Sequence, residues 1–203
     1  ALPRGMALTE TGETLLAYAR RLLELNDEAV AALRGSELQG AIRLGMQEDF
    51  GETLLPEVLG RFARAHPQLR IEARIARNAE LVSRIDQGRL DLALAWRLGA
   101  TAAHVERIGE VPLAWIGARD RRLAWRRGSG EPLPLVMLDA PCAMRTAAID
   151  ALDRAGIPWR IAFASASLAG IWAGVAAGLG LTLRTAIGLP ERLRLLAPGE
   201  ERL

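Results

Sequence analysis

Four stretches of this chain carry side chains suited to binding a small molecule. The first is 47–50, Gln-Glu-Asp-Phe, which follows a short apolar run ending at Met46. The others are Trp96-Arg97, 141–145 and 165–167. Each stretch lies at the end of, or within a few residues after, a run with the alternating or continuous apolar pattern of a strand, which places all of them at the carboxyl ends of strands. In open parallel sheets, ligands bind at these ends.

The side chains in these stretches favour recognition through hydrogen bonds and charge. A glutamine, a cysteine and two serines offer neutral hydrogen bonds, and a phenylalanine and a tryptophan offer apolar walls. Arg97 or Arg145 is able to pair with an acidic group through two parallel hydrogen bonds. Glu48 and Asp49 suit a ligand with an amine, or they cap the helix that follows. The predicted ligand-binding residues are Gln47, Glu48, Asp49, Phe50, Trp96, Arg97, Cys142, Arg145, Ser165 and Ser167.

Nothing in the sequence indicates catalysis. The nucleophile-elbow pattern G-x-S-x-G, the phosphate-binding loop and the zinc motif H-E-x-x-H are all absent. His66 precedes Pro67 at the end of a predicted helix, where capping explains it. His104 has no cysteine or histidine at metal-ligand spacing. We therefore expect no enzyme, no catalytic residue, no metal site and no cofactor.

Cys142 is the only cysteine, so no disulfide can form within the chain. A reducing compartment is the natural interpretation. Three roles for this residue stay open: a buried structural thiol, a residue that lines the ligand site, and a redox sensor. The last of these needs a positively charged and exposed setting.

The first stretch is positioned by a predicted strand–helix–strand unit over residues 41–75. The apolar run 42–46 reads as the first strand. A helix should start near Glu52 or Thr53, because Pro56 is tolerated only in the first turn of a helix. Residues 69–75 then alternate between apolar and charged types as a second strand. A unit of this size indicates a parallel sheet.

The remaining chain predicts a second array of the same kind. In the first half, we expect strands at 90–96, buried on both faces, and at 105–108 and 111–116. The second array should comprise strands at 133–138, 159–164 and 181–183, with helices at 144–155 and 168–177. A last strand, 193–196, is expected to return to the first array. The helices beginning near residues 52, 144 and 168 would point their N-termini toward the same ends of the strands, which favours an anionic ligand.

A long helix is predicted from residue 11 to residue 33. Six of its residues follow the alternating four-three spacing of a coiled-coil seam: Leu15, Ala19, Leu22, Asn26, Ala29 and Leu33. Leu16, Leu23 and Val30 widen the apolar stripe. Such a stripe would pair with another helix, or it would pack on its own domain.

Composition limits the class of protein. The 203 residues suit one large or two small domains, and half of them are apolar. The net charge of +2 is too small to indicate nucleic-acid binding by this chain alone. The arginine-rich segment 119–127 contains Trp125. It is consistent either with a patch that binds nucleic acid or with an exposed loop. We find no membrane-spanning run and no signal sequence, so a cytoplasmic protein without a membrane partner is expected.

The segment IRLGMQEDFGETLLPEVLGRFARAHPQLRIEARI, followed by LVSRIDQGRLDLALAW, resembles the opening of the effector-binding domain of LysR-type transcriptional regulators. The characteristic positions of the family pattern are matched in this sequence by Phe62, Pro67, Gly88 and Asp91. Near the start, R-G-M-A-L-T-E-T-G at 4–12 resembles the junction between a DNA-binding wing and a linker helix. Order and spacing carry this resemblance, since no single motif is specific.

The resemblance implies an α/β fold: a two-lobed, periplasmic-binding-protein-like (type 2) domain preceded by a long dimerisation helix. Residues 1–40 would hold the end of the wing and the linker helix, 41–115 with 186–203 the first lobe, and 116–185 the second. The winged helix-turn-helix would precede Ala1, and another strand and helix would follow Leu203.

The implied function is the effector-sensing and oligomerisation part of a LysR-type regulator. Its partners would be a small, anionic effector in the inter-lobe cleft, DNA through the missing N-terminal domain, and further copies in a homodimer or homotetramer. The alternative is a solute-binding protein of a transport system. The identity of the effector, activation or repression, the operator and the choice between dimer and tetramer do not follow from the sequence.

Overall fold

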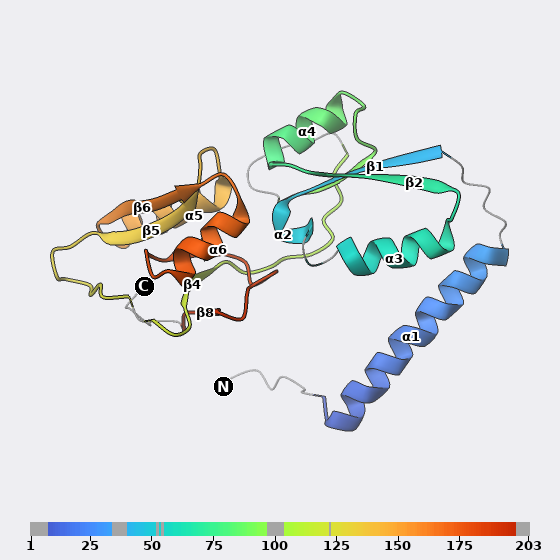
Figure 1. The fold of residues 1–203 in the computed structure, drawn as a ribbon, viewed down its shortest axis with the longest axis horizontal. Helices are drawn as coiled ribbons and strands as arrows, with labels where there is room; N and C mark the ends of the chain where they lie inside the picture. The colour runs from blue at the N-terminus through green and yellow to red at the C-terminus, as the bar shows by residue number, and fades with distance from the viewer. Residues whose placement is uncertain are drawn as a thin grey trace.

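The computed structural model describes residues 8–33, 40–51, 53, 55–96, 104–121 and 123–197. Along these ranges the order of elements is α1 (Glu10–Leu33), β1 (Gly40–Met46), α2 (Glu48–Gly51), α3 (Leu55–Ala65), β2 (Leu69–Ile75), α4 (Asn78–Asp86), β3 (Leu92–Leu94), β4 (Ala114–Ala118), β5 (Leu133–Leu138), α5 (Ala143–Arg154), β6 (Trp159–Ser165), α6 (Leu168–Ala176), β7 (Thr182–Arg184) and β8 (Leu193–Leu195). Two α/β lobes lie side by side, and α1 projects away from them (Figure 1). The expected two-lobed α/β architecture is confirmed.

The first lobe contains a parallel sheet of order β2-β1-β3. β1 pairs with β2 along its whole length, from Gly40 opposite Leu69 to Met46 opposite Ile75. The predicted strand–helix–strand unit is therefore present, and Pro56 lies in the first turn of α3 as expected. The short helix α2, which begins directly after the first strand, was not predicted. It lies at the end of β1 that faces the second lobe (Figure 1).

The second lobe is built on the parallel pair β5-β6 and the antiparallel sheet β7-β4-β8. Leu181, just before β7, forms a parallel bridge with Leu135 of β5. This close approach requires glycine at position 180, because a Cβ there would lie 2.4 Å from the Pro134 carbonyl oxygen. Helices α5 and α6 pack on these strands and bury two apolar clusters. Most of the fully buried apolar side chains belong to this lobe.

Three expectations about strands are wrong. Residues 193–195 do not return to the first lobe: β8 pairs with β4, and Leu193 is buried in the core of the second lobe. Residues 105–108 form no strand, and Ile108 is 77% exposed. The strand predicted at 90–96 is only three residues long, and Leu92 is 65% exposed, so β3 is not buried on both faces. The assignment of 198–203 lies outside the described residues.

Helix α1 confirms the predicted long helix. Its first turn is capped by the hydroxyl of Thr9, which accepts a hydrogen bond from the backbone N–H of Gly12 at 3.1 Å. Leu15 and Leu22 of the predicted seam are 69% and 66% exposed. The helix contacts α3, yet most of its apolar stripe faces solvent in the single chain. The side chain of Leu33 lies outside the described residues, and pairing with a second copy stays a prediction.

The arginine-rich segment is not a base-stacking surface. Trp125 is only 4% exposed, lies in an apolar cluster of the second lobe, and donates its indole N–H to the Glu131 carbonyl oxygen at 2.8 Å. An aromatic ring held in the core cannot stack on nucleotide bases, so Trp125 does not supply the stacking surface that the nucleic-acid interpretation of 119–127 required. Among the described helices, none combines the length and the apolar character needed to cross a membrane.

Candidate functional site

The loops at the carboxyl ends of the first-lobe strands are tied together by a chain of amide groups. Gln47 follows β1, and its side-chain NH2 donates to the Asn78 side-chain oxygen at 2.5 Å. Asn78 in turn donates to the carbonyl oxygen of Trp96, beyond β3, at 2.5 Å. These hydrogen bonds link three residues, one beyond the end of each of three strands, and fix their positions relative to one another.

Arg77 reaches from this cluster into the second lobe. Its guanidinium donates to the carbonyl oxygens of Asp139 at 2.9 Å and Ala166 at 3.4 Å. Asp139 follows β5 and Ala166 follows β6, so the strand-end loops of the two lobes meet at this arginine. Of the four predicted stretches, 165–167 takes part in this contact through Ala166, whereas the contact to the loop after β5 is made at Asp139, before the predicted stretch 141–145.

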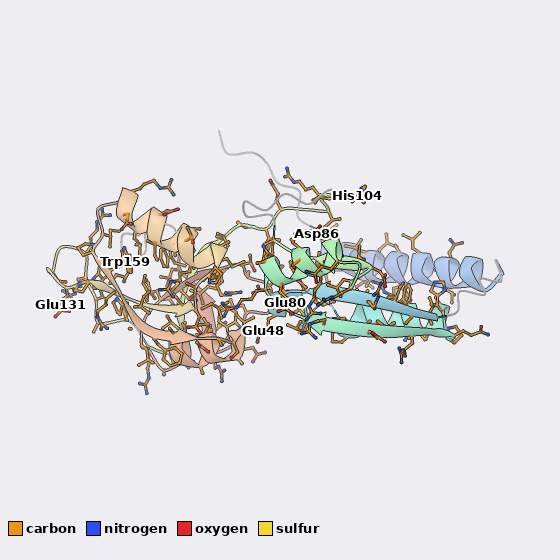
Figure 2. The ribbon with its side chains drawn as sticks, turned by 90° about the horizontal axis from the view of Figure 1, so that it is seen from above. Glu48, Glu80, Asp86, His104, Glu131 and Trp159 are labelled. Carbon is orange, nitrogen blue, oxygen red and sulfur yellow. The ribbon has the colours of Figure 1, made fainter. Side chains whose placement is uncertain are left out.

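Glu48 makes a second contact between the lobes, at the start of α6. Its carboxylate accepts the backbone N–H of Leu168 at 2.9 Å. The same helix end is capped by Ser167, whose hydroxyl accepts the N–H of Gly170 at 3.2 Å, and Ser165 accepts the N–H of Ser167 at 3.2 Å. The first turn of a helix has unpaired N–H groups and a partial positive charge. Figure 2 shows Glu48 at the boundary between the lobes, far from Glu131 and Trp159 at the outer end of the second lobe.

Asp49 forms a buried ion pair across the same boundary. Its side chain accepts from Nη2 of Arg184, on β7, at 2.5 Å. Asp49 is 2% exposed and Arg184 is 4% exposed. The other carboxylate oxygen of Asp49 accepts from the indole N–H of Trp96 at 3.3 Å. A charge at such depth is tolerated only when it is paired, as it is here.

Aromatic rings surround the ion pair. The rings of Phe50 and Trp96 have centroids 4.6 Å apart and are tilted by 35°. The guanidinium carbon of Arg184 lies 5.8 Å from the ring centroid of Trp172 on α6. The predicted apolar walls at Phe50 and Trp96 therefore lie beside the charged groups, which places those charges in a setting of low polarity.

The remaining predicted residues make no described hydrogen bond between the lobes. Arg145 donates to the carbonyl oxygen of Leu138, at the end of β5, at 3.2 Å. Cys142 precedes α5, is partly buried, and makes no capping hydrogen bond through its side chain. Arg97 lies outside the described residues. Arg145 lies in the first turn of α5, Cys142 is the residue before that helix, and Ser165 is the last residue of β6. The described hydrogen bonds of Arg145 and Ser165 stay within the second lobe.

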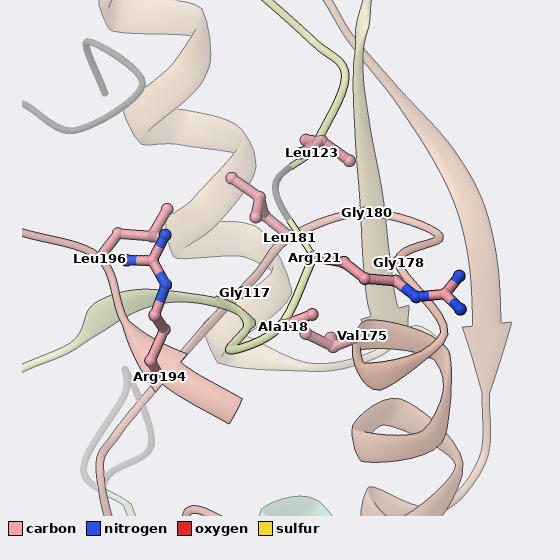
Figure 3. Close-up of a pocket in the computed structure, with 10 residues that line it drawn as sticks. All are labelled: Gly117, Ala118, Arg121, Leu123, Val175, Gly178, Gly180, Leu181, Arg194 and Leu196. Atoms are coloured by element: carbon pink, nitrogen blue, oxygen red, sulfur yellow. The ribbon is translucent and has the colours of Figure 1, made fainter. Parts of the chain in front are cut away.

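A separate shallow hollow opens on the second lobe (Figure 3). Its lining includes Gly117, Arg121 and Val175, and none of the ten predicted ligand-binding residues. In the part of the chain that the structure describes, no group of three or more His, Cys, Asp or Glu side chains is placed to hold a metal ion. The inter-lobe cluster is therefore the candidate site.

Four residues of the site were missed by sequence reasoning: Arg77, Asn78, Trp172 and Arg184. The first two directly follow β2, so the strand-end rule that selected 47–50 also applies to them. Arg184 follows Leu181-Thr182-Leu183, a predicted strand without charge, and a lone charged residue there indicates a buried charge that needs a partner. Nothing in the sequence marks Trp172.

Comparison with known proteins assigns the chain to a family. The family model described as the LysR substrate binding domain matches residues 35–200. The HTH-type transcriptional regulator PecT of Dickeya dadantii (strain 3937) is 37% identical over 198 residues, which cover 98% of this chain and 60% of PecT. The HTH-type transcriptional regulator DgdR of Burkholderia cepacia is 37% identical over 200 residues, covering 98% of this chain and 66% of DgdR. The chain thus spans less than two thirds of the length of these relatives.

A solved structure shows the same fold. It is the C-terminal domain of a probable LysR family transcriptional regulator from Rhodococcus sp. RHA1, with a TM-score of 0.62 and 26% identity. The match covers 81% of this chain and 86% of that domain. The named relatives are transcriptional regulators, which are not enzymes. The chain belongs to the LysR substrate binding domain family, the sensor domain of LysR-type transcriptional regulators, and not to the solute-binding proteins of transport systems.

Proposed function

We propose that this chain binds a small anionic metabolite between its lobes and that the full-length protein relays this binding to DNA. The observation that carries the proposal is the hydrogen bond from the Leu168 backbone N–H to a carboxylate oxygen of the other lobe. This helix end already binds a carboxylate, here that of Glu48. A carboxylate ligand offers the same acceptor geometry to the same donor.

The mechanism follows from the contacts between the lobes. Glu48, Asp49 and Arg77 each bond across the boundary, so a ligand that enters must change or replace some of these bonds. A ligand shifts an equilibrium only by its difference in affinity for the two lobe arrangements. Paired α1 helices would pass that shift to DNA-binding domains in a cytoplasmic homodimer or homotetramer. In this role the chain needs no catalytic group and no cofactor.

A paired ligand screen tests the proposal. The full-length protein is heated with a panel of small carboxylates, and each is matched with its neutral amide. We expect individual carboxylates to raise the melting temperature while their amides do not, because the binding free energy adds to the stability of the folded state. Calorimetric titration confirms each hit, and operator binding is then measured with and without it. Stabilisation by amines but not by carboxylates would contradict the proposal.

A further inference from the structure

The buried guanidinium of Arg184 is incompletely bonded. Its Nη2 donates to Asp49, but its Nε is buried and has no hydrogen-bond partner among the described residues. The indole N–H of Trp172 is also buried and has no partner there. A buried donor without an acceptor costs roughly 1–3 kcal/mol, so two of them in one region call for an explanation.

The two donors belong to the same part of the site. The guanidinium carbon of Arg184 lies 5.8 Å from the Trp172 ring centroid, and Trp172 belongs to α6, whose first turn binds Glu48. The second lobe therefore presents a cation and a helix N-terminus to the first lobe. The first lobe contributes two adjacent carboxylates that bond to these groups, Glu48 and Asp49.

A buried ion pair is weak support for stability. Taking both charges out of water costs several kcal/mol per ion, which the attraction between them offsets only in part. A well-packed apolar pair of similar volume often serves a core equally well. A charged pair at a boundary between two lobes is better explained if a charged ligand replaces one member of the pair than by stability alone.

We propose that Arg184 is the anion-recognition residue of the site, and that a carboxylate effector takes the place of Asp49 on its guanidinium. This inference rests on the proposed function, and it names both the residue and the ligand group. A carboxylate placed there keeps the arginine neutralised and accepts from its free Nε. Trp172 and Trp96 supply the flanking aromatic surface.

The exchange would also make the lobe arrangement depend on the ligand. Asp49 follows β1 in the first lobe, and Arg184 ends β7 in the second. When the effector replaces Asp49, the direct bond between these elements is lost and the released carboxylate must return to water. The free energy of the site is thereby coupled to the relative position of the lobes.

Chemical rescue tests the proposal with formate as the probe. In Asp49→Ala, the guanidinium is left unpaired beside the vacated space of a carboxylate. We expect formate to raise the melting temperature of this variant, saturably, by roughly 2–4 °C, relative to chloride at equal ionic strength. The double variant Asp49→Ala with Arg184→Gln should show no such rise. The matched control is Asp91→Ala, which removes the acidic partner of Arg43 in an exposed pair and should gain nothing from formate beyond the chloride effect.

A second measurement on the unaltered chain covers the case in which Asp49→Ala does not fold. Formate that competes with Asp49 should shift the indole N–H resonances of Trp96 and Trp172 in nitrogen–proton NMR spectra. Those of Trp125 and Trp159 should stay in place, because they donate to Glu131 and Asp153, away from the site. Equal shifts of all four resonances, or none, would overturn the proposal, as would a folded Asp49→Ala variant without rescue.

The two proposals fail separately. Carboxylate binding in the ligand screen without formate rescue would reject Arg184 and leave the proposed function standing. Rescue through Arg184 without any effect of carboxylates on operator binding would reject the proposed function and leave the anion site standing.

Discussion

Asp91 is clamped to Arg43 on both its backbone and its side chain. Its carboxylate accepts the backbone N–H of Arg43 at 2.8 Å, and it accepts Nε at 3.1 Å and Nη2 at 2.6 Å from the same residue. The backbone N–H of Asp91 returns a bond to the Arg43 carbonyl oxygen at 2.8 Å. The clamp joins β1 to the start of β3, which aligns the strand ends that carry Gln47 and Trp96.

The clamp predicts an acid-dependent contribution to stability. Hydrogen bonds from the Arg43 side chain, and then from its backbone, lower the pKa of Asp91 below its ordinary value of 3.8. A lowered pKa in the folded state stabilises the fold above pH 3.8, and this contribution is lost as the pH falls through the folded pKa. We expect Arg43→Gln to return the pKa of Asp91 toward 3.8 in a carbon-detected NMR titration.

Glu80 supplies an internal control for that titration. Its pKa is lowered by Arg84 and Arg74, which do not contact Asp91 in any described bond. The Arg43→Gln substitution should therefore leave the Glu80 titration unchanged. An Asp91 midpoint that stays low in the variant would show that some other group holds the carboxylate.

For single residues, the sequence predicted the position in the fold better than the bonding partner. Glu48, Asp49 and Ser167 were selected because they follow strands, and they do lie at the lobe boundary. Arg184 was missed, because its partner is 135 residues away and only tertiary packing brings the two together. Local spacing holds no information about such a pair.

At the scale of elements, α1 gives the sharpest prediction. Leu22 is 66% exposed in the single chain, so its burial against a second copy would contribute about 1.5–3 kcal/mol. We expect Leu22→Arg to weaken the dimer by at least tenfold, measured by light scattering after size-exclusion chromatography over a range of concentrations.

Ala17→Arg is the matched control for that substitution. It adds the same side chain to an exposed position of α1 that lies about 140° around the helix from Leu22. The dimer should tolerate it. Equal loss of dimer in both variants would point to charge, and loss in neither would mean that α1 packs elsewhere.

Elements with strong periodicity were predicted well, and short extended runs were not. The apolar face of α1 recurs over several turns, and its bounds agree closely with the prediction. Helix α3 has a strong apolar face, but it begins at Leu55 and not near Glu52 or Thr53 as expected. Residues 105–108 have the composition of a strand, but in the described structure they have no neighbour to pair with. β8 is a strand, but its partner β4 lies about 75 residues earlier along the chain, and periodicity gives no register between segments.

At the scale of the whole molecule, each lobe has its own sheet, and the described polar bonds at the boundary come from a few side chains. Glu48, Asp49 and Arg77 supply them. The two-lobed plan was predictable, because strand and helix patterns alternate in two successive arrays. The hydrogen bonds and the ion pair that join the two lobes were not predictable from the sequence. They connect loops, and the conformation of a loop depends on the fold around it.

Arg77 allows the lobe contact to be tested without touching the ion pair of Asp49. Its guanidinium bonds to the second lobe at two carbonyl oxygens, so Arg77→Ala removes both bonds and leaves the acceptors open to water. We expect a longer and broader distance distribution between spin labels at the exposed positions 63 and 150, introduced as cysteines with Cys142→Ser.

Arg70→Ala is the control for this distance measurement, because Arg70 is exposed and bonds to Glu72 within β2 of the first lobe. It removes the same side chain with no described bond to the second lobe, so the distances should stay as they are. If the Arg77 and Arg70 variants give the same distribution, the lobes are held by Glu48 and Asp49 without Arg77. In that case the coupling between ligand and lobe position would depend on the two carboxylates, and release of the second lobe would require the Glu48 bond to Leu168 to break as well as the exchange at Arg184.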